Sequence, residues 1–323
     1  MNGELSSIGC PLCEARSETL LSAKLRRGNG KVFLCNSCEH GFLDLKPELD
    51  MKEYYGEAYR KEYSNRAEVS GTNAHEIFDV YCRYQESRLE IIRPSLSENK
   101  SLIEVGCSAG QFIDHIKSEV GLINGIELDK DCCTYVNREI GINCDNNYLP
   151  ESKFKDNKYD VVCAFQVMEH APDPVSFLQE LINASASKGK IYVEVPNLYD
   201  PLIKVWDNDA YKNFYYHSVH LHYFTEGSLL EVALQAGVES SKVKFKFTQD
   251  YNLLNHLNWI INNAPQEDCH VGLSKINIKD DKDDKDGISD WLNSELMALN
   301  KSYIDRLRDI KATSNIMMVI SND

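Results

Sequence analysis

The sequence predicts an α/β protein, in which helices wrap a mostly parallel sheet and a small cysteine-rich module precedes it. Two observations carry the main part of this prediction. From residue 101 onwards, short apolar runs such as LIEV, GIEL, VVCAF and IYVEV alternate with amphipathic stretches, which is the rhythm of βαβ units. Near the carboxyl end, the strand-like runs KVKFKFT and NIMMVIS enclose a mostly helical insertion over residues 250–312. We assign residues 99–323 to one α/β domain.

The composition limits the classes of protein that fit. The chain has 323 residues, 42% of them hydrophobic, and can bury a sizeable core. Its formal net charge of −15 makes it a poor partner for the phosphate backbone of nucleic acids. It contains no run of about 18 apolar residues, and the start MNGELSSIGCPLC does not resemble a signal peptide. We expect a soluble, cytoplasmic protein without a membrane partner.

Four cysteines near the amino terminus form two CxxC pairs: Cys10 with Cys13, and Cys35 with Cys38. Two such pairs, separated by a short stretch of strand and turn residues, are typical of a tetrahedral thiolate zinc site. The weaker alternatives are His40 as a ligand in place of Cys38, and four incidental buried cysteines. The sequence therefore predicts a structural zinc ribbon over residues 1–49, in which Zn²⁺ closes a module too small to fold on apolar burial alone.

Residues 50–98 connect the two parts and begin with a tyrosine-rich segment. Tyr55, Tyr59 and Tyr63 recur at intervals of four, which places them on one face if this segment is helical. They form either a packing stripe or an aromatic lid over a bound cation or sugar. The stretch that follows has apolar residues at helical spacing and ends at Pro94. We expect residues 50–98 to be a helical lid or linker.

The strand-to-helix turn in LIEVGCSAGQF predicts a cofactor site. Gly106 and Gly110 let the backbone pass close to a ligand at the carboxyl end of the first strand. The turn lacks the GxGxxG pattern of dinucleotide sites, and Glu104 would repel a diphosphate but suit a positively charged amino acid group. At the end of the second strand, Glu127 can accept both hydrogen bonds of a ribose diol. Asp145 in NCDNNYLP is either a contact to an exocyclic adenine amine or a solvated acid.

Taken together, these motifs resemble a known family. EVGCSAGQF, GIELD, YDVVCAFQVMEHAPDP and GKIYVEVPN, in this order and spacing, resemble the successive motifs of class I S-adenosylmethionine (SAM)-dependent methyltransferases. The resemblance implies a Rossmann-like sheet in which NIMMVIS is an antiparallel last strand, and it implies SAM as the cofactor. It also implies the cofactor contacts: the methionine moiety near Glu104, Gly106 and Gly110, the ribose near Glu127, the adenine near Asp145, and the sulfonium near a wall at Gln166. Cys107 and Leu128, which stand beside these residues, are further predicted cofactor contacts.

The amino-terminal module makes the resemblance to known methyltransferases more specific. A double CxxC, a tyrosine-rich segment and this domain together resemble zinc-ribbon methyltransferases of nucleotide-sugar and surface-glycan biosynthesis, including sugar C-methyltransferases. In those C-methyltransferases a Tyr-His-Glu-His-Leu-x-Tyr-Phe stretch follows the fifth strand, and its last histidine and the preceding glutamate are the proton-removing pair. Here the stretch reads HSVHLHYF, so that His220 matches the base and Val219 stands at the glutamate position. His170 in MEHAPDP matches a further site histidine.

HSVHLHYF holds three of the nine histidines of the chain, and it suggests either a metal site or a base. A helical metal site would need a spacing of four and a carboxylate, but His217 and His220 are three apart and the nearest acid is Glu226. A base fits better, because a hydroxyl nucleophile must lose its proton and histidine titrates near neutrality. We predict His220 as the general base, with His170 or His217 orienting the acceptor; the alternative is a structural hydrogen bond of His220. His222 is expected on the opposite face if the stretch is extended.

Three functional classes follow from these patterns. The first is a small-molecule methyltransferase that acts on a hydroxyl, or secondarily on a carbon, of a nucleotide-linked or glycan-precursor sugar. The second is a ribosomal-RNA guanine methyltransferase with a zinc module, which charge disfavours because residues 1–49 hold six Lys or Arg and six Asp or Glu. The third is a cofactor-binding protein without turnover. The 250–312 insertion is expected to be a lid or a homodimer surface.

Overall fold

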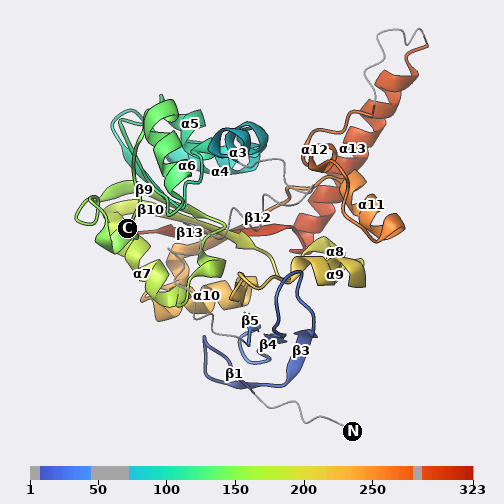
Figure 1. The fold of residues 1–323 in the computed structure, drawn as a ribbon, viewed down its shortest axis with the longest axis horizontal. Helices are drawn as coiled ribbons and strands as arrows, with labels where there is room; N and C mark the ends of the chain where they lie inside the picture. Colours follow the sequence, from blue (N-terminus) through green and yellow to red (C-terminus); the bar gives the residue numbers. More distant parts are fainter. Residues whose placement is uncertain (1–7, 45–72, 279–285, 323) are drawn as a thin grey trace.

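The computed structural model describes residues 8–44, 73–278 and 286–322 (Figure 1). The predicted tyrosine stripe at Tyr55, Tyr59 and Tyr63 lies outside the described residues. The central feature is a seven-stranded sheet in the order β12-β13-β10-β9-β6-β7-β8. Its strands are β6 (Ser101–Val105), β7 (Leu122–Ile126), β8 (Asn143–Asp145), β9 (Tyr159–Phe165), β10 (Ser185–Pro196), β12 (Val243–Thr248) and β13 (Asn315–Ser321).

The pairing of these strands confirms the predicted Rossmann-like fold. Every pair of neighbouring strands between β6 and β10 is parallel. Strand β13, in contrast, is antiparallel to both β10 and β12. The chain starts the sheet in the middle with β6, moves to one edge through β7 and β8, and returns to the other side of β6 with β9. This reversal leaves a crevice at the carboxyl ends of β6 and β9, where open α/β sheets bind their ligands.

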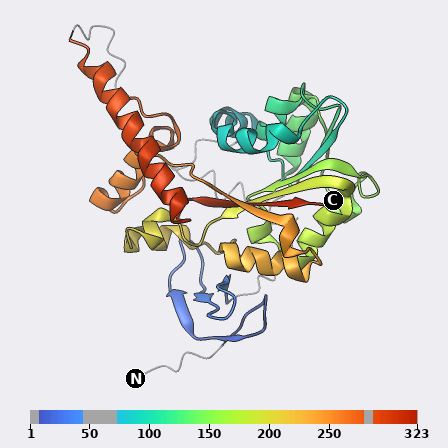
Figure 2. The ribbon, with the colours of Figure 1, turned by 180° about the vertical axis from the view of Figure 1, so that it is seen from behind.

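Helices cover both faces of the sheet (Figures 1 and 2). One face carries α3 (Ala74–Tyr81), α4 (Glu86–Ile92), α5 (Gln111–Ile116) and α6 (Lys130–Tyr135), and the other carries α7 (Pro174–Ala184) and α10 (Glu226–Gln235). Side chains along β6 alternate between the faces because a strand has a period of two. Leu102 therefore packs in the core under α4 and α5, and Ile103 in the core over α7 and α10.

Single helical turns join several of these elements. They are η2 (Cys82–Tyr84), η3 (Arg93–Ser95), the π-helical η4 (Val136–Ile140), η5 (Leu149–Glu151), η6 (Met168–His170) and η7 (Ser240–Lys242). The turn η6 directly follows the end of β9, which places MEH of the sequence at the crevice. The helical stretch predicted before Pro94 is present as α3, η2, α4 and η3.

The cysteine-rich module is built from two small antiparallel sheets, one of which continues into the main domain. It contains β1 (Ile8–Gly9), β2 (Arg16–Ser17), β3 (Thr19–Ser22), β4 (Val32–Leu34) and β5 (Gly41–Leu43). The strand β11 (His222–Tyr223), from HSVHLHYF, pairs with β5 as a fourth strand beside β4 and β3. Gly41 permits this approach because a Cβ there would lie 2.9 Å from Tyr223 Cβ. The module is thus built onto the predicted histidine stretch.

A helical insertion separates β12 from β13, as the sequence predicts. It contains α11 (Leu253–Asn262), α12 (Cys269–Leu273) and α13 (Ile288–Asp309), and α13 extends away from the sheet (Figures 1 and 2). The short helices α8 (Pro201–Lys204) and α9 (Asp209–Tyr215) precede the histidine stretch, and α9 packs on α11 through Phe214 and Trp259, whose ring centroids are 5.1 Å apart. Within the described part of the chain, no helix is both long and apolar enough to cross a membrane.

Candidate active site

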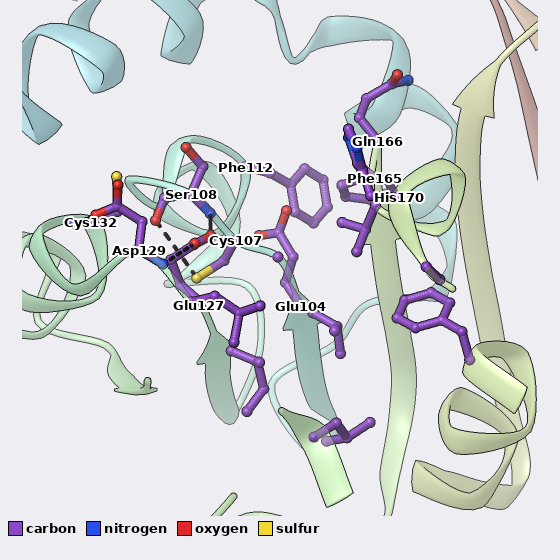
Figure 3. Close-up of a pocket in the computed structure, with 18 of the residues that line it drawn as sticks. Glu104, Cys107, Ser108, Phe112, Glu127, Asp129, Cys132, Phe165, Gln166 and His170 are labelled. Atoms are coloured by element: carbon purple, nitrogen blue, oxygen red, sulfur yellow. Dashed lines mark hydrogen bonds between the residues drawn. The ribbon is translucent and has the colours of Figure 1, made fainter. Parts of the chain in front are cut away.

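A cavity of about 710 Å³ lies in the crevice that the strand order creates (Figure 3). Its walls come from the ends of β6, β7 and β9 and from α3 and α4. The volume suits a nucleoside with an attached amino acid, since pockets for ligands of that size have about 300–1,000 Å³. Six of the predicted cofactor residues line it: Glu104, Gly106, Cys107, Glu127, Leu128 and Gln166. Gly110 and Asp145 are not among the residues that line it.

The loop after β6 carries its backbone along the cavity. Gly106 has a φ of 79°, and a Cβ there would lie 2.4 Å from Val167 Cγ2, so that no other residue fits without a shift. The amides of Gly106 and Cys107 both donate to Ile126 O, at 2.8 and 3.0 Å, which ties the loop to β7. Gly110 acts one turn later and begins α5 in the left-handed region, with a φ of 85°. Gly110 therefore shapes the loop from outside the cavity.

Glu104 is a carboxyl in the cavity wall that lacks a partner for one oxygen. Its side chain is 4% exposed, and Oε2 has no hydrogen-bond partner among the described residues. Burial raises the pKa of Glu104 to about 8, although Arg88 lowers it, and Glu127 raises it further. A buried carboxyl of this kind favours a cationic ligand group, which would satisfy the oxygen and stabilise the ionised form. An α-ammonium group fits this environment.

Glu127 is held at the end of β7 by two backbone amides (Figure 3). Its Oε2 accepts from Ser108 N and its Oε1 from Asp129 N, both at 2.7 Å. Burial raises the pKa of Glu127 to about 7, and these amide hydrogen bonds oppose the rise. Each carboxylate oxygen keeps a further lone pair, so the group can still accept the two hydroxyls of a ribose.

Asp145, which is predicted to contact the adenine, has a hydrogen-bond partner within the protein. Its Oδ2 accepts from Lys153 N at 2.8 Å, and the residue does not line the cavity. Tyr148 and Leu149, which follow it in the sequence, do line the cavity. The adenine contact at Asp145 therefore stays a prediction, and the apolar side of the base has a candidate wall at Leu149.

Arg88 is a site residue that sequence analysis missed. Its guanidinium lies in the cavity wall with Nη2 2.6 Å from Glu194 Oε1 and its central carbon 4.7 Å over the Phe165 ring. Gln166 Nε2 donates to the same Glu194 oxygen at 3.3 Å, so the predicted sulfonium wall belongs to this buried network. The signal in the sequence is weak: Arg88 stands four residues before the buried Ile92, on the buried side of α4.

The three predicted catalytic histidines lie together, and of the three only His170 lines the cavity. The Nδ1–H of His170 donates to Val219 O at 2.9 Å. The ring centroid of His220 is 4.8 Å from that of His170 and 5.3 Å from that of His217. Burial lowers the pKa of His170 to about 4, and burial and the neighbouring histidines lower that of His220 well below its usual value. At neutral pH both rings are therefore neutral, which is the form that accepts a proton.

Comparison with known proteins decides the family. A family model described as a methyltransferase domain matches residues 74–241, which is about half of the chain. The chain belongs to this methyltransferase family. It is a SAM-dependent methyltransferase, and the carboxyls at the ends of β6 and β7 fit the cationic and ribose groups of that cofactor.

The methyltransferase has several relatives of low identity. It is 25% identical over 162 residues to a ubiquinone biosynthesis O-methyltransferase of Hydrogenovibrio crunogenus, with 47% of this chain and 67% of that protein covered. It is 24% identical over 170 residues to a protein of Invertebrate iridescent virus 6 named as a methyltransferase, with 50% and 64% covered. The chain thus spans about two thirds of the length of these curated relatives. Among solved structures, a SAM-dependent methyltransferase from Archaeoglobus fulgidus has a TM-score of 0.47 at 17% identity, covering 76% of this chain and 99% of that one.

Binding of SAM to the methyltransferase is expected to release protons near neutral pH. In the free protein the pKa of Glu104 is raised from 4.5 to about 8, and a bound ammonium group would lower it again. The affinity for SAM should therefore rise with pH up to about 8 and level off above it. Calorimetric titrations in buffers of different ionisation enthalpy measure the released protons, and Glu104→Gln should reduce them. Equal proton release in this variant would show that another group titrates.

His222 of the methyltransferase faces the cysteine-rich module. Its Nδ1 accepts from His40 Nε2 at 2.9 Å, and its Nε2–H donates to Ala171 O at 3.0 Å. The premise of the prediction for His222 is wrong, because side chains two positions apart in an extended strand lie on the same side. His220 and His222 have different partners because His220 precedes β11 and is not part of that strand. His40 is used in this contact, and it is not part of the cysteine cluster. The two histidines link the module to the turn that carries His170.

The four amino-terminal cysteines of the methyltransferase form one cluster. Their sulfur atoms all lie within 4.8 Å of one another. Leu12 N donates to Cys10 Sγ at 3.4 Å. Burial opposes ionisation of Cys35, but the amides of Cys38 and Ser37 and the neighbouring thiols outweigh it and lower the pKa of Cys35 to about 7. Four sulfur donors with amide support are compatible with a zinc ribbon.

Proposed function

We propose that this methyltransferase transfers the methyl group of SAM to a hydroxyl oxygen of a nucleotide-linked sugar or related glycan precursor, with a sugar carbon as the second candidate. The observation that carries this proposal is the cluster of neutral histidines beside the cavity. A hydroxyl acceptor must lose its proton as the methyl group is transferred, so it needs a base next to the methyl donor. The relative from H. crunogenus, which is named for methylation of an oxygen, supports oxygen as the acceptor atom.

The proposed mechanism divides the site into a binding half and a proton-accepting half. SAM supplies an electrophilic methyl group on its sulfonium. Glu104 binds the amino acid end and Glu127 the ribose, so that the methyl group is held in line with the acceptor. His220 removes the hydroxyl proton. His170, which is fixed through Nδ1 to Val219 O and lines the cavity, orients the acceptor.

The amino-terminal module supplies a positive charge to the acceptor side. Arg26 N donates to Tyr216 O at 2.7 Å, just before the histidine stretch, and the Arg26 guanidinium lies 3.7 Å over the Phe214 ring. The charge of Arg26 acts on His220, where it adds to the lowering of the pKa by burial and by the other histidines. In a chain with a net charge of −15, an arginine at this place supports an acceptor with an anionic part, such as a nucleotide diphosphate.

Three further assignments are part of the proposal. Zn²⁺ is the structural ion of the cysteine cluster, because the donor set is that of closed zinc sites. Residues 1–49, 50–98 and 99–323 act as ribbon, connecting lid and methyltransferase domain. The exposed apolar residues of α13, among them Trp291, favour a homodimer surface over a lid for the insertion.

A methyl-transfer assay tests the function directly. Purified protein, radiolabelled SAM and a panel of nucleotide-linked sugars are expected to give a methylated sugar. His220→Ala should lower turnover by about 100-fold or more and leave SAM affinity unchanged, since the base acts on the acceptor. His115→Ala is the matched control, because this exposed imidazole bonds only to the backbone at Cys82 O among the described contacts. Undiminished turnover in His220→Ala would remove His220 from the mechanism.

A further inference from the structure

Glu169 is a buried carboxyl that lies against the histidine pair and has no part in the mechanism above. Its side chain is 1% exposed, and Oε2 has no hydrogen-bond partner within the described ranges. Oε1 is 3.8 Å from His170 Nε2. One oxygen of Glu169 and one ring nitrogen each of His170 and His220 all lie within 4.8 Å of one another. A carboxyl this deeply buried is costly to keep unless it has a partner.

Two hydrogen bonds to backbone carbonyl oxygens hold this group in place. Leu221 N donates to Glu169 O at 2.9 Å, and His170 Nδ1–H donates to Val219 O at 2.9 Å. The turn η6 and the histidine stretch are therefore fixed to each other on both sides of the carboxyl. The position of Val219, next to the proposed base, has no carboxylate of its own. Glu169 brings a carboxyl to the same histidine from a different segment of the chain.

We propose that Glu169 is a positioning residue for the histidine pair, whose carboxylate balances the positive charge that forms on His220 during methyl transfer. The inference rests on the proposed function, because it assumes a hydroxyl acceptor. In the transfer step the hydroxyl proton moves to a ring nitrogen of His220, and the oxygen forms the new C–O bond. The electron pair of the broken C–S bond stays on sulfur. The imidazolium is then paired with the Glu169 carboxylate until its proton passes to solvent.

The protonation states around Glu169 fit this role. Burial raises the pKa of Glu169 to about 8; its own amide and Arg88 lower it, and Glu194 raises it. The titratable groups that face the cluster are His170, His217 and His220, with Tyr215 and Arg26 next to them. The pKa values of His170 and His220 are lowered by burial, so a titration near pH 8 in this cluster belongs to the carboxyl. The active form is then the one with Glu169 ionised and the histidines neutral.

Histidine NMR on the full chain, without an acceptor, tests the assignment. With ¹⁵N-labelled protein, the ring nitrogens of His170 are expected to shift with a midpoint near pH 8, which reports ionisation of Glu169. Glu169→Gln should abolish this shift, and Glu169→Asp should retain a shift at an altered midpoint. Asp200→Asn is the matched control: it removes another buried carboxyl, whose pKa burial raises to about 7, and should leave the shift in place. A shift with an unchanged midpoint in Glu169→Gln would overturn the inference.

Turnover gives the second readout. With a nucleotide sugar found active in the panel, Glu169→Gln should lower kcat by about tenfold or more, keep the KM for SAM, and lose the rise of activity between about pH 7 and 9. Glu169→Asp should recover part of kcat and the pH dependence. A purely structural role would lower the melting temperature of both variants and leave the pH profile unchanged, which would contradict the inference. The NMR result does not depend on any acceptor, so failure of the sugar assay and failure of the Glu169 assignment are distinguishable.

Discussion

Replacing Glu127 by alanine is expected to weaken SAM binding by about 100-fold or more. The carboxylate accepts two backbone amides and keeps lone pairs for a ribose diol, and each hydrogen bond to a charged group contributes about 1.5–3 kcal/mol. Loss of two ligand hydrogen bonds thus removes about 3 kcal/mol or more, and every 1.4 kcal/mol is about tenfold in affinity. Calorimetric titration with SAM or its demethylated product measures the change.

Two variants separate ligand binding from loop structure. Glu127→Gln keeps an acceptor for the backbone amides and for one hydroxyl, so its affinity should lie between those of the parent and of Glu127→Ala. Asp160→Asn is the control at the other end of the sheet: Asp160 Oδ2 accepts from Ser101 N at 2.9 Å, where β6 begins. It should leave SAM affinity unchanged. Alanine at Glu127 with nearly the parent affinity would show that the ribose is held elsewhere.

Six of the eight residues predicted for the cofactor line the cavity, and the sequence could indicate this because their signals are local. Glu104 and Glu127 stand at the ends of short apolar runs, and parallel strands that are neighbours in a sheet bring such ends together. Gly106 indicates a backbone turn that only glycine tolerates. Asp145 also ends a strand, but it does not line the cavity, and Lys153 N from the turn that follows donates to its Oδ2. The periodicity of the strand does not reveal this contact.

The acceptor side could not be predicted to the same extent because it is built from distant segments. His40 and His222 are 182 positions apart, and β11 is too short to give a strand pattern. Glu169 lies in η6, after the end of β9, and next to His170 in MEHAPDP it has the pattern of an ordinary polar turn residue. It is buried in the tertiary structure, where Leu221 N from a distant segment donates to its carbonyl oxygen. Arg88 is similar, since a cation on an amphipathic helix is usually solvent-exposed until a buried partner such as Glu194 is known.

Removal of the proposed zinc ion is expected to stop methyl transfer while SAM binding persists. The free energy of zinc binding is folding free energy in such modules, so Cys35→Ser or a chelator should unfold the ribbon locally. Strand β11 would then lose β5, and His222 would lose His40, which together fix the turn that carries His170. The carboxyls of Glu104 and Glu127, which we propose to bind SAM, stand at the ends of β6 and β7 and have no contact with the ribbon among the described hydrogen bonds.

The expected result is a loss of turnover of about 100-fold or more with SAM affinity changed by less than about threefold. Metal analysis, calorimetry and the methyl-transfer assay on the same Cys35→Ser sample measure the three quantities. Cys82→Ser is the matched control, because Cys82 lies outside the four-cysteine cluster and should leave zinc content and turnover intact. His40→Ala separates the two effects of the ribbon: it keeps all four sulfurs but removes the contact to His222, and should retain zinc while turnover falls. Full activity in a zinc-free sample would contradict the prediction. It would mean that contacts within the main domain alone keep His170, His217 and His220 in place.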